Sequence, residues 1–116
     1  MSHNLFKVFI GRLDAINEIK SQLEAFVDTK KVSARSIGIE YIEQSEEVIV
    51  SLGYSANGEY TPVTITPVDL GVVDFKDTTK MESLMSAAAT KQQNVICHEL
   101  FITHKKELMM LFMSTK

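Results

Sequence analysis

The stretch Ile37–Ser55, IGIEYIEQSEEVIVSLGYS, and the stretch Ile96–Ser114, ICHELFITHKKELMMLFMS, align without a gap at a separation of 59 residues. Each contains two runs of alternating apolar residues around a short polar turn, which predicts a β-hairpin. The turns are Ser45-Glu46-Glu47 and His104-Lys105-Lys106, which have opposite charge. The second half of the chain therefore repeats the layout of the first.

One strand and one amphipathic helix precede the first hairpin. Apolar residues alternate over Leu5–Gly11, and Asp14 is the predicted N-cap of a helix of about four turns. The predicted apolar stripe of that helix is Ile16, Ile19, Leu23 and Phe26 or Val27. That helix ends at Thr29-Lys30-Lys31, where the helix dipole favours cations. The hairpin strands are then Ser36–Gln44 and Glu47–Ser55.

Asn57-Gly58 is a signal for a further hairpin, because a type I′ turn needs positive φ at both central positions. It predicts an additional strand over Glu59–Thr66. Pro62 and Pro67 have no backbone N–H, so we expect that strand at the edge of a sheet.

The second half is predicted to open with a strand over Leu70–Phe75. The capping-box spacing of Thr79-x-x-Glu82 predicts the start of a second helix, which ends at Gln92-Gln93-Asn94. Val95–Thr103 and Glu107–Ser114 form the last hairpin. The sequence predicts one α+β domain over residues 1–116, with strand–helix–strand–strand repeats at about 5–66 and about 70–115. We expect a mainly antiparallel sheet with two helices on one face.

Size and composition are those of an ordinary globular domain. The 116 residues are 45% hydrophobic and 23% charged. A chain of this length can form a stable hydrophobic core without disulfide bonds or bound metals. A net charge of −3 and only two arginines, Arg12 and Arg35, argue against a nucleic-acid partner. A single cysteine, Cys97, excludes an internal disulfide. No signal peptide or membrane span is recognisable, so we expect a cytoplasmic protein with no membrane partner.

The hairpins have two apolar faces. One is expected to form the core beneath the two helices. Its residues are Ile37, Ile39, Tyr41, Val48, Val50, Leu52, Ile96, Leu100, Ile102, Met109 and Leu111. The residues of the opposite face are Phe9, Ile42, Ile49, Phe101, Leu108, Met110 and Phe112. Because no third helix can cover this second face, we expect a homodimer or higher oligomer that packs sheet on sheet. The alternative is a tilted or barrel-like sheet that buries both faces in one chain.

The two charged turns suggest a second contact between copies. Glu46-Glu47 and Lys105-Lys106 occupy equivalent tips, so a head-to-tail or pseudo-symmetric neighbour would bring one tip against the other. Two solvated hairpin ends are the alternative, because exposed ion pairs contribute little.

No catalytic or metal-binding constellation is recognisable, and no cofactor is expected. His3 lies in the N-terminal tail, and His98 and His104 would be roughly 20 Å apart on one strand, too far to share a metal. Cys97 and His98 point to opposite faces of a strand, which argues against a cysteine nucleophile. His98 takes the place of the core residue Ile39, so we expect it to be buried and structural.

The tyrosines predict a binding site better than a catalytic one. Tyrosine offers a flat surface with one polar tip, which suits a small aromatic or nucleotide-like ligand. The candidate ligand-binding residues are Arg12, Tyr41, Tyr54, Asn57, Tyr60 and His98. All three tyrosines lie in the first repeat, so a pocket between the repeats would be asymmetric. Tyrosines that only border the core are the alternative.

The duplicated strand–helix–strand–strand layout resembles the gyrase-inhibitory-protein-like small-molecule-binding domains. This resemblance implies two such units with a ligand in the groove between them. The chain departs from that pattern because it has no tryptophan and no recognisable buried acidic residue for such a groove, which argues against cationic drugs as ligands. The first unit is also similar to the very short strand–helix–strand–strand proteins of sporulating bacteria and phages.

We therefore expect a non-enzymatic, oligomeric protein that holds a small, nucleotide-like ligand in a groove between repeats or subunits. The alternative is a protein-sequestering module such as a toxin-immunity protein or a phage-encoded inhibitor. A concave tyrosine-lined pocket would favour the ligand, and a flat acidic patch would favour a basic protein partner. That patch would consist of Glu43, Glu46, Glu47 and Glu59.

Overall fold

The computed structural model describes residues 4–116, so His3 lies outside the described residues. Each half of the chain has the order strand, helix, strand, strand. The elements are β1 (Leu5–Arg12), the short 3-10 turn η1 (Leu13–Ala15), α1 (Ile16–Lys30), β2 (Ser33–Ile42), β3 (Glu47–Ser55), β4 (Val63–Val72), α2 (Thr78–Thr90), β5 (Val95–Ile102) and β6 (Glu107–Thr115).

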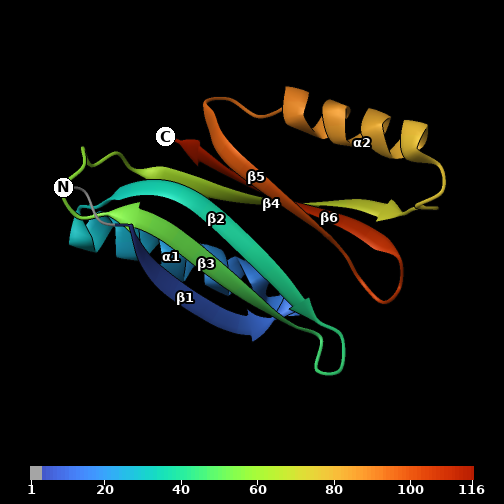
Figure 1. Ribbon diagram of the computed structural model, residues 1–116, viewed down its shortest axis with the longest axis horizontal. Helices are drawn as coiled ribbons and strands as arrows, with labels where there is room; N and C mark the ends of the chain where they lie inside the picture. The colour runs from blue at the N-terminus through green and yellow to red at the C-terminus, as the bar shows by residue number, and fades with distance from the viewer. Residues whose placement is uncertain (1–3) are drawn as a thin grey trace.

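The strands form two three-stranded antiparallel sheets, with β2 and β5 side by side where the sheets meet (Figure 1). The strand orders are β1-β3-β2 and β4-β6-β5, so the two halves have the same topology. The predicted α+β class with antiparallel strands is confirmed. The strands are divided between two sheets, and the central strand of each sheet, β3 or β6, is the second strand of its hairpin.

The sequence predicted two strands in the middle of the chain, over residues 59–66 and 70–75. The structure has one strand there, β4. β4 pairs with β6, because β3 already has β1 and β2 on its two edges and can accept no third partner. Asn57-Gly58 therefore links the two sheets instead of closing a hairpin, and neither residue has positive φ. Pro67 does lie in an edge strand, as predicted.

Both helices start differently from the prediction. Asp14 lies in η1, and the N-cap of α1 is Ala15, whose side chain accepts no capping hydrogen bond. In α2 the cap is Asp77, not Thr79: its Oδ1 accepts the backbone N–H of Lys80 at 3.1 Å. An aspartate one residue before the helix was thus the better capping signal.

α1 lies against the first sheet and also contacts β4 of the second, so it belongs to the main core (Figure 1). It buries Ile19, Leu23 and Val27 at the helical spacing predicted from the sequence. This core joins α1, the inner face of the first sheet and one face of the second. Its buried residues are Phe9, Ile19, Leu23, Val27, Val32, Ile37, Val48, Val50, Leu52, Val63, Ile65, Phe101, Leu111 and Met113.

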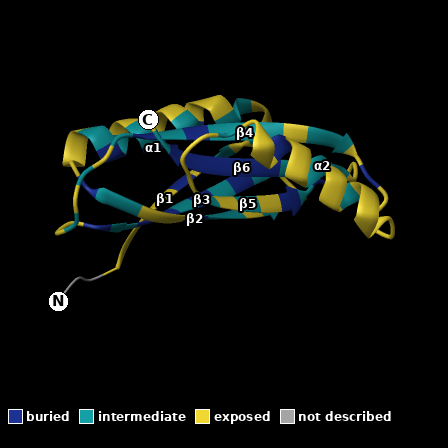
Figure 2. Ribbon diagram, turned by 90° about the horizontal axis from the view of Figure 1, so that it is seen from above, coloured by how far each residue is buried: buried dark blue, intermediate teal, exposed yellow. Residues whose placement is uncertain are grey.

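α2 covers the other face of the second sheet and is itself largely exposed beside the buried strand β6 (Figure 2). Ala88 packs there with Met110 and Phe112, whereas Leu111 and Met113 of the same strand face the main core. The two helices therefore cover opposite faces of the second sheet, not one common face. The second apolar face of β6, which seemed to need another subunit, is covered within the chain.

The expected oligomer face is corrected accordingly. Five of its seven residues are buried within the chain, and only Ile42 and Ile49 stay partly exposed. The five buried residues are Phe9, Phe101, Leu108, Met110 and Phe112. The sequence alignment has a separation of 59 residues and so pairs Val50 with Met109. In the structure, the residue of β6 that faces its helix as Val50 does is Met110, which is 60 residues away. A shift of one residue turns every side chain of a strand to the other face.

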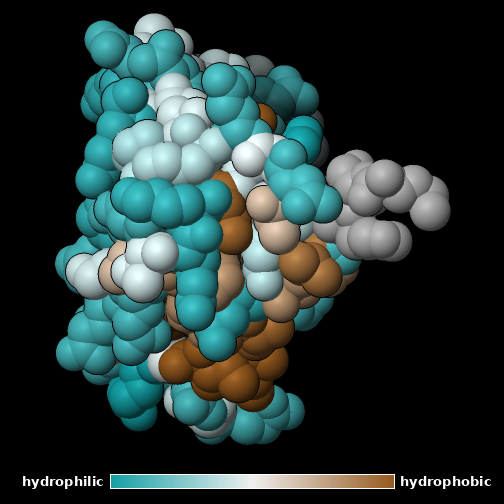
Figure 3. All heavy atoms as spheres, turned by 90° about the vertical axis from the view of Figure 1, so that its left-hand side faces the viewer, coloured by the Kyte–Doolittle hydropathy of each residue, from teal (hydrophilic) through white to brown (hydrophobic). Residues whose placement is uncertain are grey.

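The exposed apolar residues lie elsewhere, and three of the most exposed form a row on the outer face of the first sheet. On the edge strand β1, Phe6 is 68% exposed, Val8 51% and Ile10 61%. Ile10 pairs with Ile49, which places Ile49 on the same face. Figure 3 shows an exposed apolar area in its lower part, toward the side where β1 lies in Figure 1. No helix among the described residues is long and apolar enough to cross a membrane.

Candidate functional site

The two hairpin turns, η1 and β4 surround a pocket at one pole of the molecule. Its volume is about 300 Å³, and both halves of the chain contribute to it. We call it the pole pocket. Its lining residues are Arg12, Leu13, Asp14, Tyr41, Glu46, Asp69, Thr103, His104, Lys105, Glu107 and Met109.

Backbone hydrogen bonds hold both turns in place. Glu46 has a φ of 54°, and its carbonyl accepts the N–H of Leu13 at 2.9 Å, which ties the first turn to η1. Lys106 has a φ of 61°, and its carbonyl accepts the N–H of Val73 at 2.9 Å. The second turn is thus tied to the chain that follows β4, and the pocket walls are anchored to both sheets.

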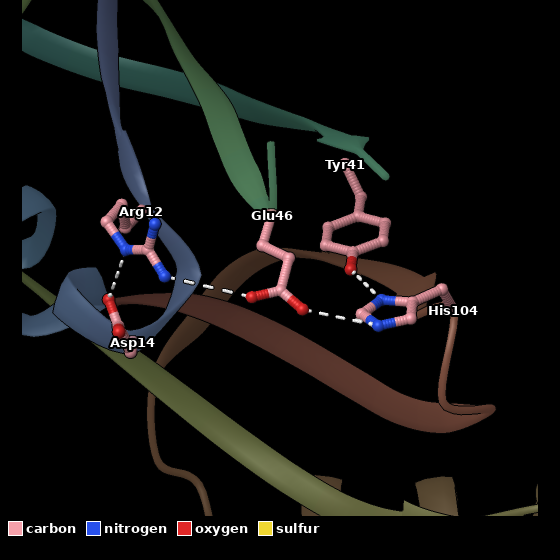
Figure 4. Close-up of polar contacts among 5 residues, drawn as sticks. All are labelled: Arg12, Asp14, Tyr41, Glu46 and His104. Atoms are coloured by element: carbon pink, nitrogen blue, oxygen red, sulfur yellow. Dashed lines mark hydrogen bonds and ion pairs between the residues drawn. The ribbon is translucent and has the colours of Figure 1, made fainter. Parts of the chain in front are cut away.

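Five side chains form a continuous row of polar contacts along the pole pocket (Figure 4). The Tyr41 hydroxyl lies 2.5 Å from Nδ1 of His104, and Nε2 of His104 lies 3.2 Å from Oε1 of Glu46. The other carboxylate oxygen of Glu46 lies 3.7 Å from Nη2 of Arg12. The Nε–H of Arg12 donates to Oδ1 of Asp14 at 3.3 Å.

Both ring nitrogens of His104 have a partner in this row. The neutral ring with its proton on Nε2 donates to Glu46 and accepts from the Tyr41 hydroxyl. A protonated ring donates to both residues instead. The two contacts of His104 are therefore compatible with either role of Nδ1, as acceptor or as donor.

The core holds the Tyr41 ring while its hydroxyl reaches the pocket. Phe101 stacks on it with ring centroids 5.7 Å apart and planes 24° apart. The side chains of His104 and Glu46 are 31% and 45% exposed, so a molecule in solution can reach the row. These polar groups line a surface site and are not a buried structural network.

Two carboxylates of the pole pocket stand outside this row. Asp69 accepts the N–H of Gly71 at 2.8 Å, and Glu107 lies on the neighbouring strand β6. Among residues 4–116 neither carboxylate forms an ion pair. Their charge is available to a ligand.

The structure brings together only two of the residues predicted to bind a ligand, Arg12 and Tyr41. Tyr54 lies at the other end of β3, where its ring meets Phe26 edge-on at 5.2 Å. The Tyr60 hydroxyl donates to Oδ1 of Asp28 at 2.7 Å. That hydrogen bond, partial burial and the nearby charge raise the pKa of Tyr60.

Asn57 and His98 also lie outside the pole pocket. Asn57 is exposed in the link between the sheets. His98 was expected to be buried, and it is exposed. It pairs with Phe112 on the α2 side of the second sheet, where the short helix does not cover it. His98 aligns with Ile39 of the first half, which packs against the core, but His98 itself does not lie in the core.

Sequence reasoning missed His104 and Glu46 as site residues. The signal that points to them is the pair of oppositely charged turns, which we interpreted as a contact between copies or as two solvated hairpin ends. The turns meet within one chain, and the contact runs through His104 rather than through Lys105 and Lys106.

The acidic residues do not form one patch. Glu43, Glu46 and Glu47 lie at the β2–β3 turn, whereas Glu59 lines a second pocket with Ser33 at the opposite end of β2. That pocket has a volume of about 310 Å³ and contains no comparable row of side-chain contacts among the described residues.

Cys97 lies on β5 beside β2 and is partly exposed. Burial raises the pKa of its thiol, although the backbone of Ile37 partly offsets this effect. A raised pKa reduces the thiolate fraction, so nothing here activates the thiol as a nucleophile.

No group of three or more histidine, cysteine, aspartate and glutamate side chains within residues 4–116 is placed to hold a metal ion. No protein-family model matches the chain, and neither a curated protein nor a solved structure is significantly similar to it.

Proposed function

We propose that the protein binds a small molecule in the pole pocket, between its two halves. The observation that carries this proposal is the anchored row Tyr41–His104–Glu46–Arg12, which crosses from one half to the other along the pocket wall. A volume of about 300 Å³ is at the lower end of the range for ligand pockets. It suits a ligand of about the size of a nucleobase or a nucleoside.

The lining favours a partly apolar ligand with hydrogen-bond donors. Leu13 and Met109 offer apolar contact, and the carboxylates of Asp69 and Glu107 can accept hydrogen bonds. The two cations of the lining, Arg12 and Lys105, are outnumbered by its four carboxylates, so the pocket has no excess of positive charge for a phosphate. A nucleotide-like ligand would therefore be recognised through its base and not through its phosphates.

Native mass spectrometry of freshly purified protein tests this proposal directly, together with thermal shifts against nucleobases, nucleosides and aromatic amines. A ligand at one hundred times its Kd should stabilise the fold by about 2.7 kcal/mol. Asp69→Asn should weaken that effect, and Glu59→Gln in the second pocket is the matched control. The proposal fails if no small molecule is retained and no compound shifts the melting temperature.

Self-association is proposed as part of this function, through a different surface from the one that the sequence predicted. β1 is an edge strand with a free backbone edge and an apolar outer row, Phe6, Val8 and Ile10. An antiparallel second copy with Val8 opposite Val8 would place Phe6 opposite Ile10. The combined row would be apolar throughout, so this edge is self-complementary.

Sedimentation of the wild type and of Val8→Lys tests this contact. We expect a dimer for the wild type and a monomer for the variant, because the new charge cannot be buried unpaired. Ile96→Lys on β5 is the control and should stay dimeric. A wild-type monomer at micromolar concentration, or a dimer that Val8→Lys does not change, would exclude this contact.

A further inference from the structure

We infer that Tyr41 is a nucleophile that accepts an acyl group from a small activated carboxylic ester, with His104 as the general base. The inference rests on the proposed function, because it uses the pole pocket as the place where the ester binds. It adds a reaction to what was proposed as a binding site.

The geometry is that of an activated hydroxyl. The nucleophile and the base are in hydrogen-bond contact, at 2.5 Å between the Tyr41 hydroxyl and Nδ1 of His104. The base is oriented by a third group, since Nε2 lies 3.2 Å from Glu46. Arg12, 3.7 Å from the other oxygen of Glu46, fixes that carboxylate. Glu46 and Arg12 are positioning residues, because they act through His104.

The other two tyrosines show what is particular to Tyr41. Tyr60 donates to Asp28, a carboxylate that is too weak a base to accept a phenol proton and whose charge opposes ionisation. The hydroxyl of Tyr54 has no side-chain partner among the described residues. Only Tyr41 contacts an imidazole, whose basicity near neutral pH suits proton transfer during bond formation.

The acyl transfer needs no oxidant or reductant. Oη of Tyr41 attacks the carbonyl carbon, and its proton passes to Nδ1 of His104. The bond from that carbon to the leaving oxygen then breaks, and the leaving oxygen takes the proton from the imidazolium that Glu46 stabilises. A water molecule, deprotonated by the same nitrogen, can later hydrolyse the acyl-tyrosine to the free acid and restore Tyr41.

The charges around the pole pocket restrict the acyl donor. Lys105 lines the pocket and supplies positive charge for the oxyanion of the tetrahedral intermediate. Asp69 and Glu107 would repel a donor that carries a phosphate or a second carboxylate. The substrate class is therefore a neutral or cationic ester.

Treatment with p-nitrophenyl acetate, followed by peptide mapping with mass spectrometry, tests the inference within one sample. Tyr41 should be acetylated well before Tyr54 and Tyr60, which serve as internal controls. Tyr41→Phe should remove the fast release of p-nitrophenolate. Glu46→Gln should slow it, and His104→Gln should slow it by about 100-fold.

The pH dependence separates a base from a merely structural histidine. The pH profile of Tyr41 acetylation should differ between the wild type and His104→Gln, because the variant has lost the base that takes the phenol proton. Circular dichroism and melting temperature check that each variant is folded. If His104→Gln does not fold, Glu46→Gln serves as the test of the base.

Equal acetylation of Tyr41 and Tyr54, or a rate that neither His104→Gln nor Glu46→Gln changes, would overturn the inference. A pole pocket that binds ligands while Tyr41 stays inert would refute the reaction and leave the proposed function standing. Selective acetylation of Tyr41 without any retained or stabilising ligand would support the reaction and refute the binding role.

Discussion

The two helices have equivalent places in the two halves, yet they stabilise the molecule in different ways. α1 buries three apolar side chains and contacts strands of both sheets, whereas α2 buries only Ala88 and lies on one sheet. α1 is part of the core, and α2 is a cover. Similar amphipathic patterns therefore formed two helices with different roles, because only α1 lies where the sheets converge.

Polar links strengthen this difference. Oε2 of Glu24 on α1 accepts the backbone N–H of Ile65 at 2.8 Å, on the free edge of β4. Asp28 of the same helix accepts from Tyr60, just before that strand. Among the described residues, no side chain of α2 makes a hydrogen bond to either sheet. α1 thus holds the second half to the first.

Truncation of one apolar side chain on each helix should give the largest contrast. Leu23→Ala should cost about 2–5 kcal/mol in the free energy of unfolding, because it opens a cavity in the shared core. Met85→Ala on the partly exposed α2 should cost less than about 2 kcal/mol. Urea denaturation measures both. Equal losses would show that α2 contributes to the core as much as α1 does.

Removal of the link between α1 and β4 should have an intermediate effect. Glu24→Ala leaves the N–H of Ile65 without its acceptor and should cost about 1–3 kcal/mol. Gln22→Ala, at an exposed position of the same helix, is the control and should change little. Amide exchange at Ile65 should become faster only in Glu24→Ala. Unchanged exchange there would mean that the edge of β4 does not depend on α1.

The contact between Tyr60 and Asp28 should have the smallest effect, and its contribution to stability should be lost only at alkaline pH. Because the hydrogen bond to Asp28 raises the pKa of Tyr60 in the folded state, the neutral phenol is favoured there. Its contribution to stability is fully present below the unfolded pKa of about 10 and is lost as the pH rises through the folded pKa. Urea denaturation between pH 8 and pH 11 should show this loss in the wild type and not in Tyr60→Phe. The same pH dependence in both proteins would assign the loss to other groups.

Local patterns in the sequence were sufficient for the fold class. Alternating apolar residues predicted both hairpins, and the helical spacing of Ile19, Leu23 and Val27 predicted the buried stripe of α1. Periods of two and 3.6 residues arise from strand and helix geometry itself, so they can be read without knowledge of the partners. The predicted edge position of Pro67 rested on a similarly local fact, its missing N–H.

The candidate site was predicted only in part, through Arg12 and Tyr41. Nothing local shows that Glu46 and His104 approach each other, because they lie far apart in the chain and each resembles a solvated turn residue. Their charge difference was visible in the sequence, but the distance between them depends on how the two sheets pack. For that reason the sequence suggested two solvated turns or a contact between copies, and not a contact within one chain.

The sequence by itself determined β1, the two hairpins and the presence of both helices, because side-chain periodicity and backbone chemistry act within a few residues. Tertiary structure alone decided that β4 joins the second sheet, since β3 had no free edge. It also decided which face of β6 lies under α2. A shift of the strand register by one residue would place Leu111 under α2 in place of Met110. The pole pocket follows from both decisions, because the packing of the two sheets places His104 against Glu46 and Tyr41.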